Sequence, residues 1–510
     1  MDLNRLPRMY PSPIQHILVA GSGTDALLAA ATLKRSFPGI TITLLRDPSA
    51  PAADPAGEST TPAVLQHICN GLGLQGADIH LYARPVWTLG FRYLWGARGT
   101  FYRSFDAPYG GGLQGFRTEP GFLAAESGLD NSTLSMALMS AGKLFPKDGA
   151  NSFKPIENVT GLNFRPEPLH ALLLRACTAL GVNIRNGKPA GLTRNPDTLV
   201  LEDGSTLAAD LYIDATGPEA LLATLAGNAE WVSYADACLC PRAATIARRR
   251  GSEPIRPFST VETLDSGWRW RVEHDDSIGL GHAWHPDFIS EDQACAELVA
   301  KGGDSALVPR VHRWNPGRRK EAWLGSVVAV GDASGFVEPL SALRTTHLVL
   351  HLNWLVRVLA ATDGLPGDES RRTYGRVVAE AWDENRDFHA LHYCFNSTGK
   401  SPFWEMARRE AALKKYAGLV ELYGSIGPSA ALSNCLPVWP GFIGIDSWIS
   451  ALIGLGVPFR HHPPIPPQEK KAWDATCEQR RASARQAVPA ELCIGAARRA
   501  LKPQPRVPLP

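Results

Sequence analysis

Residues 14–26 read IQHILVAGSGTDA, an apolar run that ends directly at a glycine-rich turn. From Thr24 to Phe37 the apolar side chains then have helical spacing, and Ile40–Leu45 is a second, β-branched run. This order predicts a strand, a helix and a second strand parallel to the first. The chain is therefore expected to have an α/β fold.

The turn between strand and helix has the form Gly-x-Gly-x-x-Ala. Gly21 permits a tight turn, Gly23 lets the backbone approach a pyrophosphate at the helix N-terminus, and Ala26 allows close helix–strand packing. Asp47 follows the second strand, where an acid normally binds the ribose hydroxyls. Because the motif lies in a βαβ context, we predict a dinucleotide site. Its expected contacts are Gly21, Gly23, Thr24, Asp25, Ala26 and Asp47.

Two later strand ends indicate that the dinucleotide is FAD. Residues 209–217 and 326–333 each contain a short apolar strand, an acid and a small-residue turn. The second segment resembles the strand-Gly-Asp element of FAD hydroxylases, whose acid contacts the ribityl or pyrophosphate region. This resemblance implies that Gly331 and Asp332 bind the ribityl side of FAD. The chain up to Leu340 would then run past the isoalloxazine ring, in a two-dinucleotide-domain fold of the glutathione-reductase/hydroxylase type.

The composition argues against several other classes. Among 510 residues, 52 Lys and Arg nearly balance 50 Asp and Glu, so no nucleic-acid partner is expected. No run approaches the roughly 20 apolar residues that span a bilayer, and the N-terminus does not resemble a signal peptide. The nine cysteines are scattered, and Cys238 and Cys240 have no matching pair of metal ligands. We expect a cytoplasmic protein with no metal or membrane partner.

Several further segments resemble one family, the flavin-dependent tryptophan halogenases. They occur in the family's order across residues 14–460 and are Gly57–Pro62, Trp268–Val272, Glu384–Tyr393, Phe403–Trp404, Ser447–Trp448 and Gly454–Pro458. The resemblance implies that Ser59 and Thr60 also contact FAD. It further implies that a separate flavin reductase supplies reduced FAD, which reacts with O2 to give a C4a-hydroperoxide.

The lysine and glutamate that the family uses for halogenation are missing. Thr88 stands at the lysine position, and its hydroxyl cannot act as a cation. Arg92 has no accessible amine form. Ser341 stands at the glutamate position, and Arg344 replaces the glycine of the chloride-binding turn. We expect these four residues to mark an altered reaction chamber, in which Arg344 either contacts an anionic substrate or the flavin peroxide, or forms a structural ion pair.

Three functions are compatible with this pattern. The favoured one is an FAD-dependent monooxygenase or oxidase that acts on an aromatic or indole-like small molecule. The candidate pocket aromatics are Trp87, Phe91, Tyr93, Trp268 and Trp270, and the candidate acid–base groups are His282, His389 and His392. The alternatives are a halogenase whose activating group has moved to Arg84 or Arg92, and a flavin-binding protein without catalysis.

The FAD-binding subdomain is expected to be discontinuous, with substrate-binding segments inserted between its parts. Its parts are 1–70, 151–225 and 320–370, and the inserted segments are 71–150 and 226–319. A helical region, 371–465, is expected to cap the fold. Residues 466–510 are rich in proline and basic residues with little periodicity, and we expect a loosely ordered tail. A homodimer is one assembly state left open.

Overall fold

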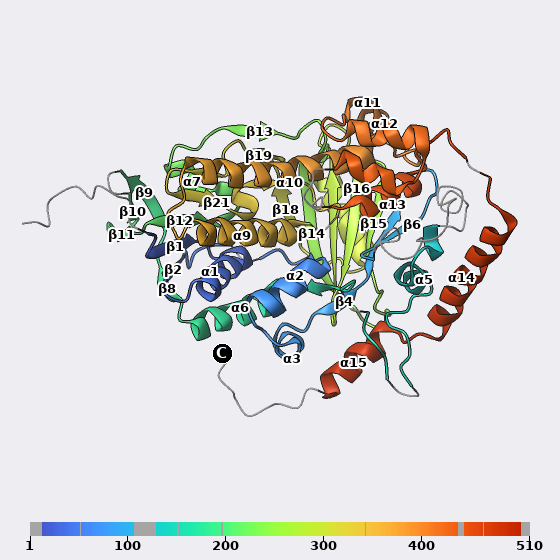
Figure 1. The fold of residues 1–510 in the computed structure, drawn as a ribbon, viewed down its shortest axis with the longest axis horizontal. Helices are drawn as coiled ribbons and strands as arrows, with labels where there is room; N and C mark the ends of the chain where they lie inside the picture. Colours follow the sequence, from blue (N-terminus) through green and yellow to red (C-terminus); the bar gives the residue numbers. More distant parts are fainter. Residues whose placement is uncertain are drawn as a thin grey trace, which may run out of the picture.

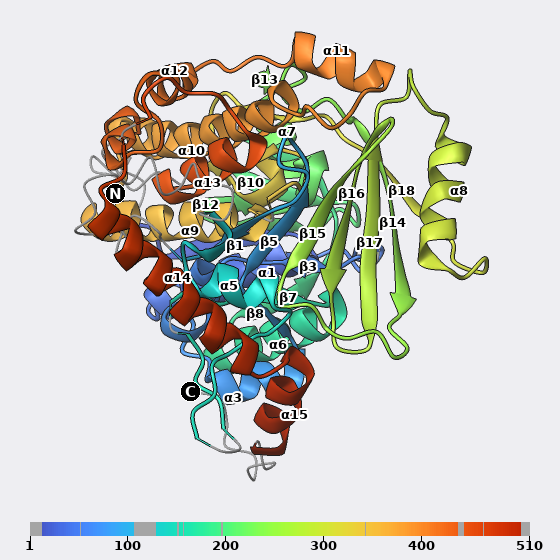
Figure 2. The ribbon, with the colours of Figure 1, turned by 90° about the vertical axis from the view of Figure 1, so that its right-hand side faces the viewer.

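Two large sheets organise the chain (Figures 1 and 2). The computed structural model describes residues 13–51, 53–106, 129–149, 152–156, 158–194, 197–341, 343–436, 443–462 and 464–500. Within these residues one large sheet has six strands and the other has seven. Part of the predicted substrate segment 71–150, residues 107–128, lies outside the described residues.

The six-stranded sheet contains the predicted βαβ unit. Its strands, in spatial order, are β20 (Trp323–Leu324), β21 (Val327–Ala329), β12 (Leu211–Asp214), β1 (His16–Ala20), β2 (Thr41–Arg46) and β8 (Asn183–Asn186). β1 and β2 are parallel, with Val19 opposite Leu44, and α1 (Thr24–Ser36) connects them. The prediction of an α/β fold with this unit is confirmed.

β1, β12 and β21 are parallel neighbours, so their carboxyl ends meet at one edge of the sheet. Backbone hydrogen bonds continue across that edge. The amide of Ala215 donates to the carbonyl of Ala20 at 2.9 Å, and the amide of Val330 donates to that of Asp214 at 2.9 Å. The glycine turn after β1 and the Gly-Asp turn after β21 are thus brought together from positions over 300 residues apart.

The seven-stranded sheet is antiparallel except at one pair. Its strands, in spatial order, are β18 (Arg310–Arg313), β14 (Arg242–Arg249), β17 (Ser277–Trp284), β16 (Gly267–Glu273), β15 (Ser259–Leu264), β5 (Gly90–Leu94) and β6 (Phe101–Ser104). β5 and β15 are parallel, with Tyr93 opposite Val261. α8 (Glu291–Gly302) packs on the outer face of β14 and β17 (Figure 2).

Three small sheets and a set of helices complete the fold (Figure 1). The small sheets are β11 (Thr206–Ala208), β10 (Thr198–Leu201) and β9 (Pro189–Thr193); β13 (Trp231–Ser233), β19 (Gly317–Arg319) and β22 (Gly335–Phe336); and β3 (Glu58–Ser59), β7 (Gly161–Phe164) and β4 (Val86–Thr88). The remaining main helices are α2 (Pro62–Gln66), α5 (Leu134–Ser140), α6 (Pro166–Leu180), α7 (Leu221–Leu225), α9 (Arg344–Ala361), α10 (Asp368–Cys394), α11 (Pro402–Glu410), α12 (Ala417–Ile426) and α13 (Ile445–Leu455). Across the described ranges, every helix is too short or too polar to span a bilayer.

The expectation of a loosely ordered tail is wrong for residues 467–500. They form α14 (Pro467–Gln486) and α15 (Ala490–Ala500), which run along one side of the molecule (Figure 2). Trp473 and Cys477 are four residues apart and buried, which gives α14 an apolar face against α5. Pro467 occupies the first turn of α14, where proline is favoured, so the proline-rich stretch marks a helix start.

Candidate functional site

The glycine turn after β1 fits a pyrophosphate. Gly21 has φ +146°, and a Cβ placed there would lie 2.2 Å from the carbonyl oxygen of Ala215, so glycine is required. A Cβ at Gly23 would meet no atom within 4 Å, which leaves open space before α1. No side chain caps the first turn of α1, so its N–H groups are available to an anion.

Ser22 ties this turn to the end of β2. Its hydroxyl donates to the backbone carbonyl of Asp47 at 2.9 Å and accepts from the Asp47 amide at 2.8 Å. Asp47 is partly exposed, and hydrogen bonds from the side chain and backbone of Ser49 lower the pKa of its carboxylate. Asp47 is therefore ionised at neutral pH. Arg46 lies 3.3 Å from the His170 ring nitrogen instead.

Arg344, the first residue of α9, joins three carboxylates at the sheet edge. Its guanidinium lies 2.7 Å from Asp25, 2.9 Å from Asp332 and 3.6 Å from Glu58. Burial raises the pKa of Asp25 to about 6, against the opposing effect of Arg344. Of the two roles left open for Arg344, the structure shows the ion pair. Its single positive charge offsets part of the negative charge of these three acids, which reduces their repulsion of an anion beside α1.

The other predicted cofactor residues are built into the protein interior. Thr60 donates its hydroxyl to the Leu162 carbonyl at 2.8 Å, and Ser59 accepts from Ser259 at 3.2 Å. Both side chains therefore anchor β3 in the interior, and the backbone amide of Thr60 is also engaged, since it donates to the Leu162 carbonyl at 2.9 Å. Leu340 is fully buried, and its carbonyl accepts from the hydroxyl of Tyr93 at 3.3 Å.

Thr88 and Ser341 are both buried and supply no charge. Thr88 is 0% exposed, and its hydroxyl donates to the Gly90 carbonyl at 3.2 Å. Ser341 is 1% exposed, and its hydroxyl oxygen has no hydrogen-bond partner among the described residues. The contact of Tyr93 with Leu340 places β5 beside this segment. The structure thus brings the Ser341 segment to the strand that follows Thr88.

Arg92 and Arg84 lie away from these groups. Side chains alternate along β5, so Arg92 points to the opposite face from Phe91 and Tyr93. Arg84 donates to Asp275 at 2.7 Å, and its side chain is half exposed. Arg103 on β6, which the sequence analysis missed, lies on the face of Phe91, with its guanidinium carbon 4.9 Å from that ring. A single basic residue inside the apolar run FYRSF was the available signal.

Glu338, also missed, is the acid next to the chamber. Its carboxylate accepts from Trp268 at 2.9 Å, from Tyr393 at 2.5 Å and from the Cys240 amide at 2.8 Å. Burial raises the pKa of Glu338 to about 7, against these hydrogen bonds. The acid stands between apolar residues at Val337 and Leu340, a pattern that could have drawn attention to it.

The three candidate histidines differ in what they can still do. His389 has both ring nitrogens on backbone carbonyls, and His282 contacts the Ala294 carbonyl at 3.2 Å, with a pKa lowered by burial to about 4. Burial lowers the pKa of His392 to about 3, so its ring is neutral. Nδ1 of His392 lies 2.8 Å from the Phe388 carbonyl, while Nε2 has no partner.

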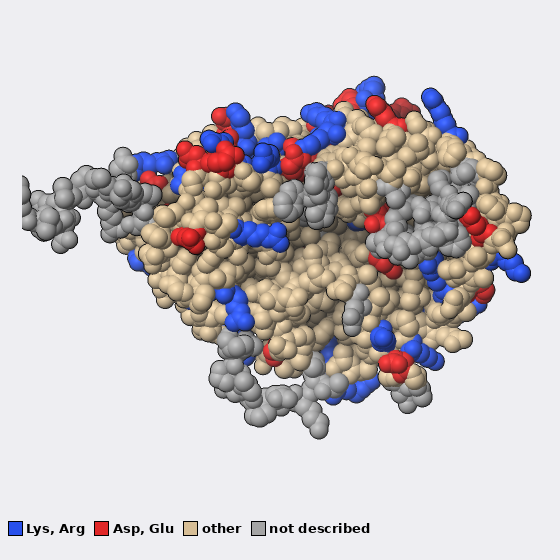
Figure 3. Space-filling view, in the orientation of Figure 1, with Lys and Arg blue, Asp and Glu red and all other residues tan. Residues whose placement is uncertain are grey.

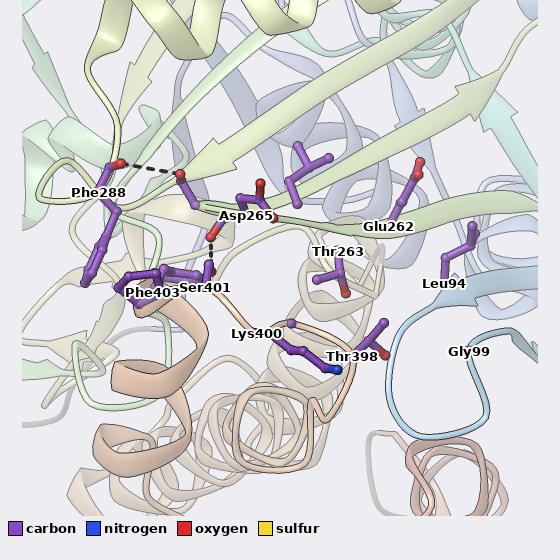
Figure 4. Close-up of a pocket in the computed structure, with 14 residues that line it drawn as sticks. Leu94, Gly99, Glu262, Thr263, Asp265, Phe288, Thr398, Lys400, Ser401 and Phe403 are labelled. Carbon is purple, nitrogen blue, oxygen red and sulfur yellow. Dashed lines mark hydrogen bonds between the residues drawn. The ribbon is translucent and has the colours of Figure 1, made fainter.

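A cavity of about 870 Å³ lies elsewhere, between the β15–β16 turn and the loop before α11 (Figure 4). Glu262, Asp265, Lys400 and Phe403 are among its lining residues. None of the predicted site residues lines it, so it is separate from the dinucleotide turn. On the face in Figure 3, Lys and Arg alternate with Asp and Glu around the edge, and the middle is mostly uncharged.

Comparison with known proteins gives concordant matches. The sequence model of the tryptophan halogenase family matches residues 16–468. The tryptophan 7-halogenase RebH of Lentzea aerocolonigenes is 25% identical over 433 residues, covering 78% of this chain and 80% of RebH. The tryptophan 6-halogenase SttH of Streptomyces toxytricini is 27% identical over 268 residues, and that match spans only about half of SttH (49%). The crystal structure of MibH, a tryptophan 5-halogenase, has a TM-score of 0.84 at 26% identity, covering 97% of this chain and 95% of MibH.

Proposed function

We propose that this chain, which belongs to the tryptophan halogenase family, is an FAD-dependent monooxygenase that acts on an aromatic or indole-like small molecule. The observation that carries the proposal is the pair of buried hydroxyls at the family's lysine and glutamate positions. Thr88, hydrogen-bonded to the Gly90 carbonyl, provides no amine, and Ser341 provides no carboxylate. A halide-derived oxidant would find no activating pair there.

The residues at the sheet edge have separate roles in this proposal. Gly23 and the free N–H groups of α1 would hold the pyrophosphate, Asp47 the adenosine ribose and Asp332 the ribityl chain. Arg344 would offset part of the negative charge of the neighbouring acids. When bound, reduced FAD supplies the two electrons that activate O2, and we propose that a separate flavin reductase delivers it.

The aromatic face of β5 and β6 would hold the substrate and exclude water. Phe91 and Tyr93 are 2% and 0% exposed, and Tyr93 touches the segment that ends in Ser341. Direct oxygen transfer needs the reacting carbon at contact distance from the flavin, which favours a chamber enclosed in this way.

The test supplies purified protein with FAD, a flavin reductase, NADH and O2, with chloride, with bromide or without halide. A panel of indoles and phenols is screened by mass spectrometry. Catalase is added throughout, so that peroxide released from free reduced flavin does not generate products. Gain of one oxygen atom, labelled by ¹⁸O2 and independent of halide, is the expected result.

A halogenated product would overturn the proposal and support the halogenase alternative. Tight FAD binding with no product in any halide condition would support the non-catalytic alternative. Gly23→Ala is the matched control, since its methyl group enters the open space before α1 without touching the protein. If the product is made at the flavin site, this variant should form less of it, in proportion to its weaker affinity for FAD.

A further inference from the structure

Two arginines of the seven-stranded sheet have no acidic partner. Arg92 lies on β5, and Arg256 lies in the loop that joins β14 to β15. Both residues are partly buried, and neither guanidinium forms an ion pair or a hydrogen bond with any residue that the structure describes. The Nε atom of Arg92 is fully buried. Because withdrawing a charge from water without a partner is costly, both arginines indicate an anion that binds from solution.

The strand register places Arg92 on the outer face of the sheet, the face on which α8 packs (Figure 2). Arg92 lies opposite Thr260, and Thr260 lies opposite Arg271. Arg271 lies opposite Leu280, which belongs to the apolar cluster that α8 covers. Residues directly opposite each other share a face, whereas successive residues of one strand alternate between faces. Arg92 is therefore on the other side of the sheet from the aromatic chamber.

Two further arginines of this face show the usual pairing. Arg269 lies 2.6 Å from Glu262. Arg271 lies 2.8 Å from Glu253 and 2.6 Å from Glu273. These three glutamates are thus engaged with the arginines of β16, and the arginines without partners stand beside them with their charge unbalanced.

A buried hydroxyl lies next to Arg92. Thr260 is 7% exposed, and its Oγ1 has no hydrogen-bond partner among the described residues. Buried polar groups in folded proteins are nearly always satisfied. A free hydroxyl beside a free guanidinium gives two donors that point to the same missing acceptor.

Arg256 reaches the same place from its loop. Tyr102, on β6, lies opposite Arg92. Burial raises the pKa of the Tyr102 hydroxyl, and the charges of Arg92 and Arg256 both oppose that rise, so both guanidiniums lie near it. Burial and the positive charges of Arg271 and Arg92 lower the pKa of Arg256, while two nearby glutamates act in the opposite direction. Two arginines that repel each other thus meet beside one tyrosine.

A phosphate group matches these donors. They come from three separate segments, and a tetrahedral oxyanion can accept from all of them, whereas a carboxylate has only two oxygens. Two guanidiniums that repel each other are best balanced by a ligand with more than one negative charge.

We propose that Arg92, Arg256 and the hydroxyl of Thr260 bind a phosphate group on the outer face of the seven-stranded sheet. The ligand is free phosphate or a phosphate monoester, and the ring of Tyr102 is placed to stack against an aromatic ester. This site goes beyond the proposed function, because it lies across the sheet from the chamber and uses neither flavin nor O2.

The test measures binding by isothermal titration at pH 7.5 and constant ionic strength. Excess FAD is present throughout, because it competes for the turn before α1, which could also hold phosphate. Inorganic phosphate and phenyl phosphate are titrated separately, and acetate is the single-charged comparison. Both phosphates should bind, and acetate should not displace them. Tighter binding of phenyl phosphate identifies an ester as the ligand, and equal affinities identify free phosphate.

Three variants locate the site. Arg92→Met and Arg256→Met should each weaken phosphate binding at least about tenfold, and Thr260→Val, which keeps the shape of the side chain, about three- to tenfold. Arg249→Met is the matched control, because it removes the same charge from an exposed arginine at the end of β14, and it should keep the wild-type affinity.

Several results would overturn the proposal. They are no phosphate binding by the wild type, displacement by acetate at equal ionic strength, an equal loss of affinity in Arg249→Met, or an affinity that survives in both Arg92→Met and Arg256→Met. If Arg92→Met fails to fold, Arg256→Met and Thr260→Val decide, because Arg256 lies in a loop and valine suits a strand.

Discussion

Replacing Glu338 with glutamine should remove a pH dependence from the stability of the protein. The carboxyl group is 1% exposed and accepts three hydrogen bonds, from Trp268, Tyr393 and the Cys240 amide. Burial raises its pKa from 4.5 to about 7, because the charged form loses more hydration than these donors return.

The direction follows from the raised pKa. The folded protein holds the Glu338 proton more tightly than the unfolded chain does, so this group stabilises the fold most at low pH. That stability is lost as the pH rises from the unfolded value of 4.5 through the folded value of about 7. Between pH 5 and pH 8 the loss amounts to about 2.5 kcal/mol.

Glutamine does not titrate, but it fits the donors less well. One of its two polar atoms is an NH2 group that must face a donor where an oxygen accepted before, at a cost of about 1–3 kcal/mol. Glu338→Gln should therefore be less stable than the wild type at pH 5. By pH 8 the difference should shrink by about 2.5 kcal/mol or change sign.

Urea unfolding followed by tryptophan fluorescence, at half-unit steps from pH 5 to pH 8, measures this difference. Glu410→Gln is the control, because Glu410 is an exposed carboxylate at the end of α11 and should follow the wild-type profile. Parallel pH profiles for the wild type and Glu338→Gln would refute the reasoning, since they would mean that Glu338 titrates alike in both states.

Further variants test the sheet edge and the C-terminus. Gly21→Ala should lower the free energy of unfolding in urea by at least about 3 kcal/mol, because its methyl group meets the Ala215 carbonyl. Gly23→Ala should leave the unfolding midpoint unchanged but weaken the affinity for FAD about tenfold, as measured by fluorescence titration. Arg344→Met should weaken FAD binding by at least about tenfold, since three acids lose their cation. The double variant with Asp25→Asn should recover part of that loss, and an unchanged affinity for FAD in Arg344→Met would contradict the role of the cluster. Ending the chain at residue 465 removes α14 and exposes the surface of α5 that α14 covers, so the free energy of unfolding should fall by at least about 3 kcal/mol in the same assay. If the tail were loosely ordered, the truncation would leave the free energy of unfolding unchanged.

Local pattern was enough to predict the βαβ unit and its turn. The run from Ile14 to Ala26 contains the strand, the glycine spacing and the helix start within 13 residues, so each feature supports the next. The expectation of a loosely ordered tail failed because the composition around Pro467 resembles that of disordered segments. The buried face of α14 depends on only three residues of a 20-residue helix, Trp473, Cys477 and Ala484, and on a partner, α5.

The missing parts of the site depend on distant pairing. Arg344 meets Asp25 across 319 positions, and nothing local to either residue indicates the other. Arg92 was named and Arg103 was missed because the sequence does not show which face of the β5–β6 hairpin is aromatic and enclosed. The βαβ unit could be predicted from residues that are neighbours in sequence. Predicting which residues line the chamber would have required the register of strands that meet only in the folded protein.

The parallel pairing of β5 with β15 has a mechanical consequence. Through β15 it joins the strand that carries Phe91 to β16, the strand that carries both Trp268 and Trp270, so one continuous hydrogen-bonded sheet forms the wall of the chamber. Such a sheet resists opening, because separating two of its strands breaks a whole row of backbone bonds. We therefore expect substrates to enter where α10 and α13 cover the sheet, by a hinge-like displacement of helices that need break only side-chain contacts.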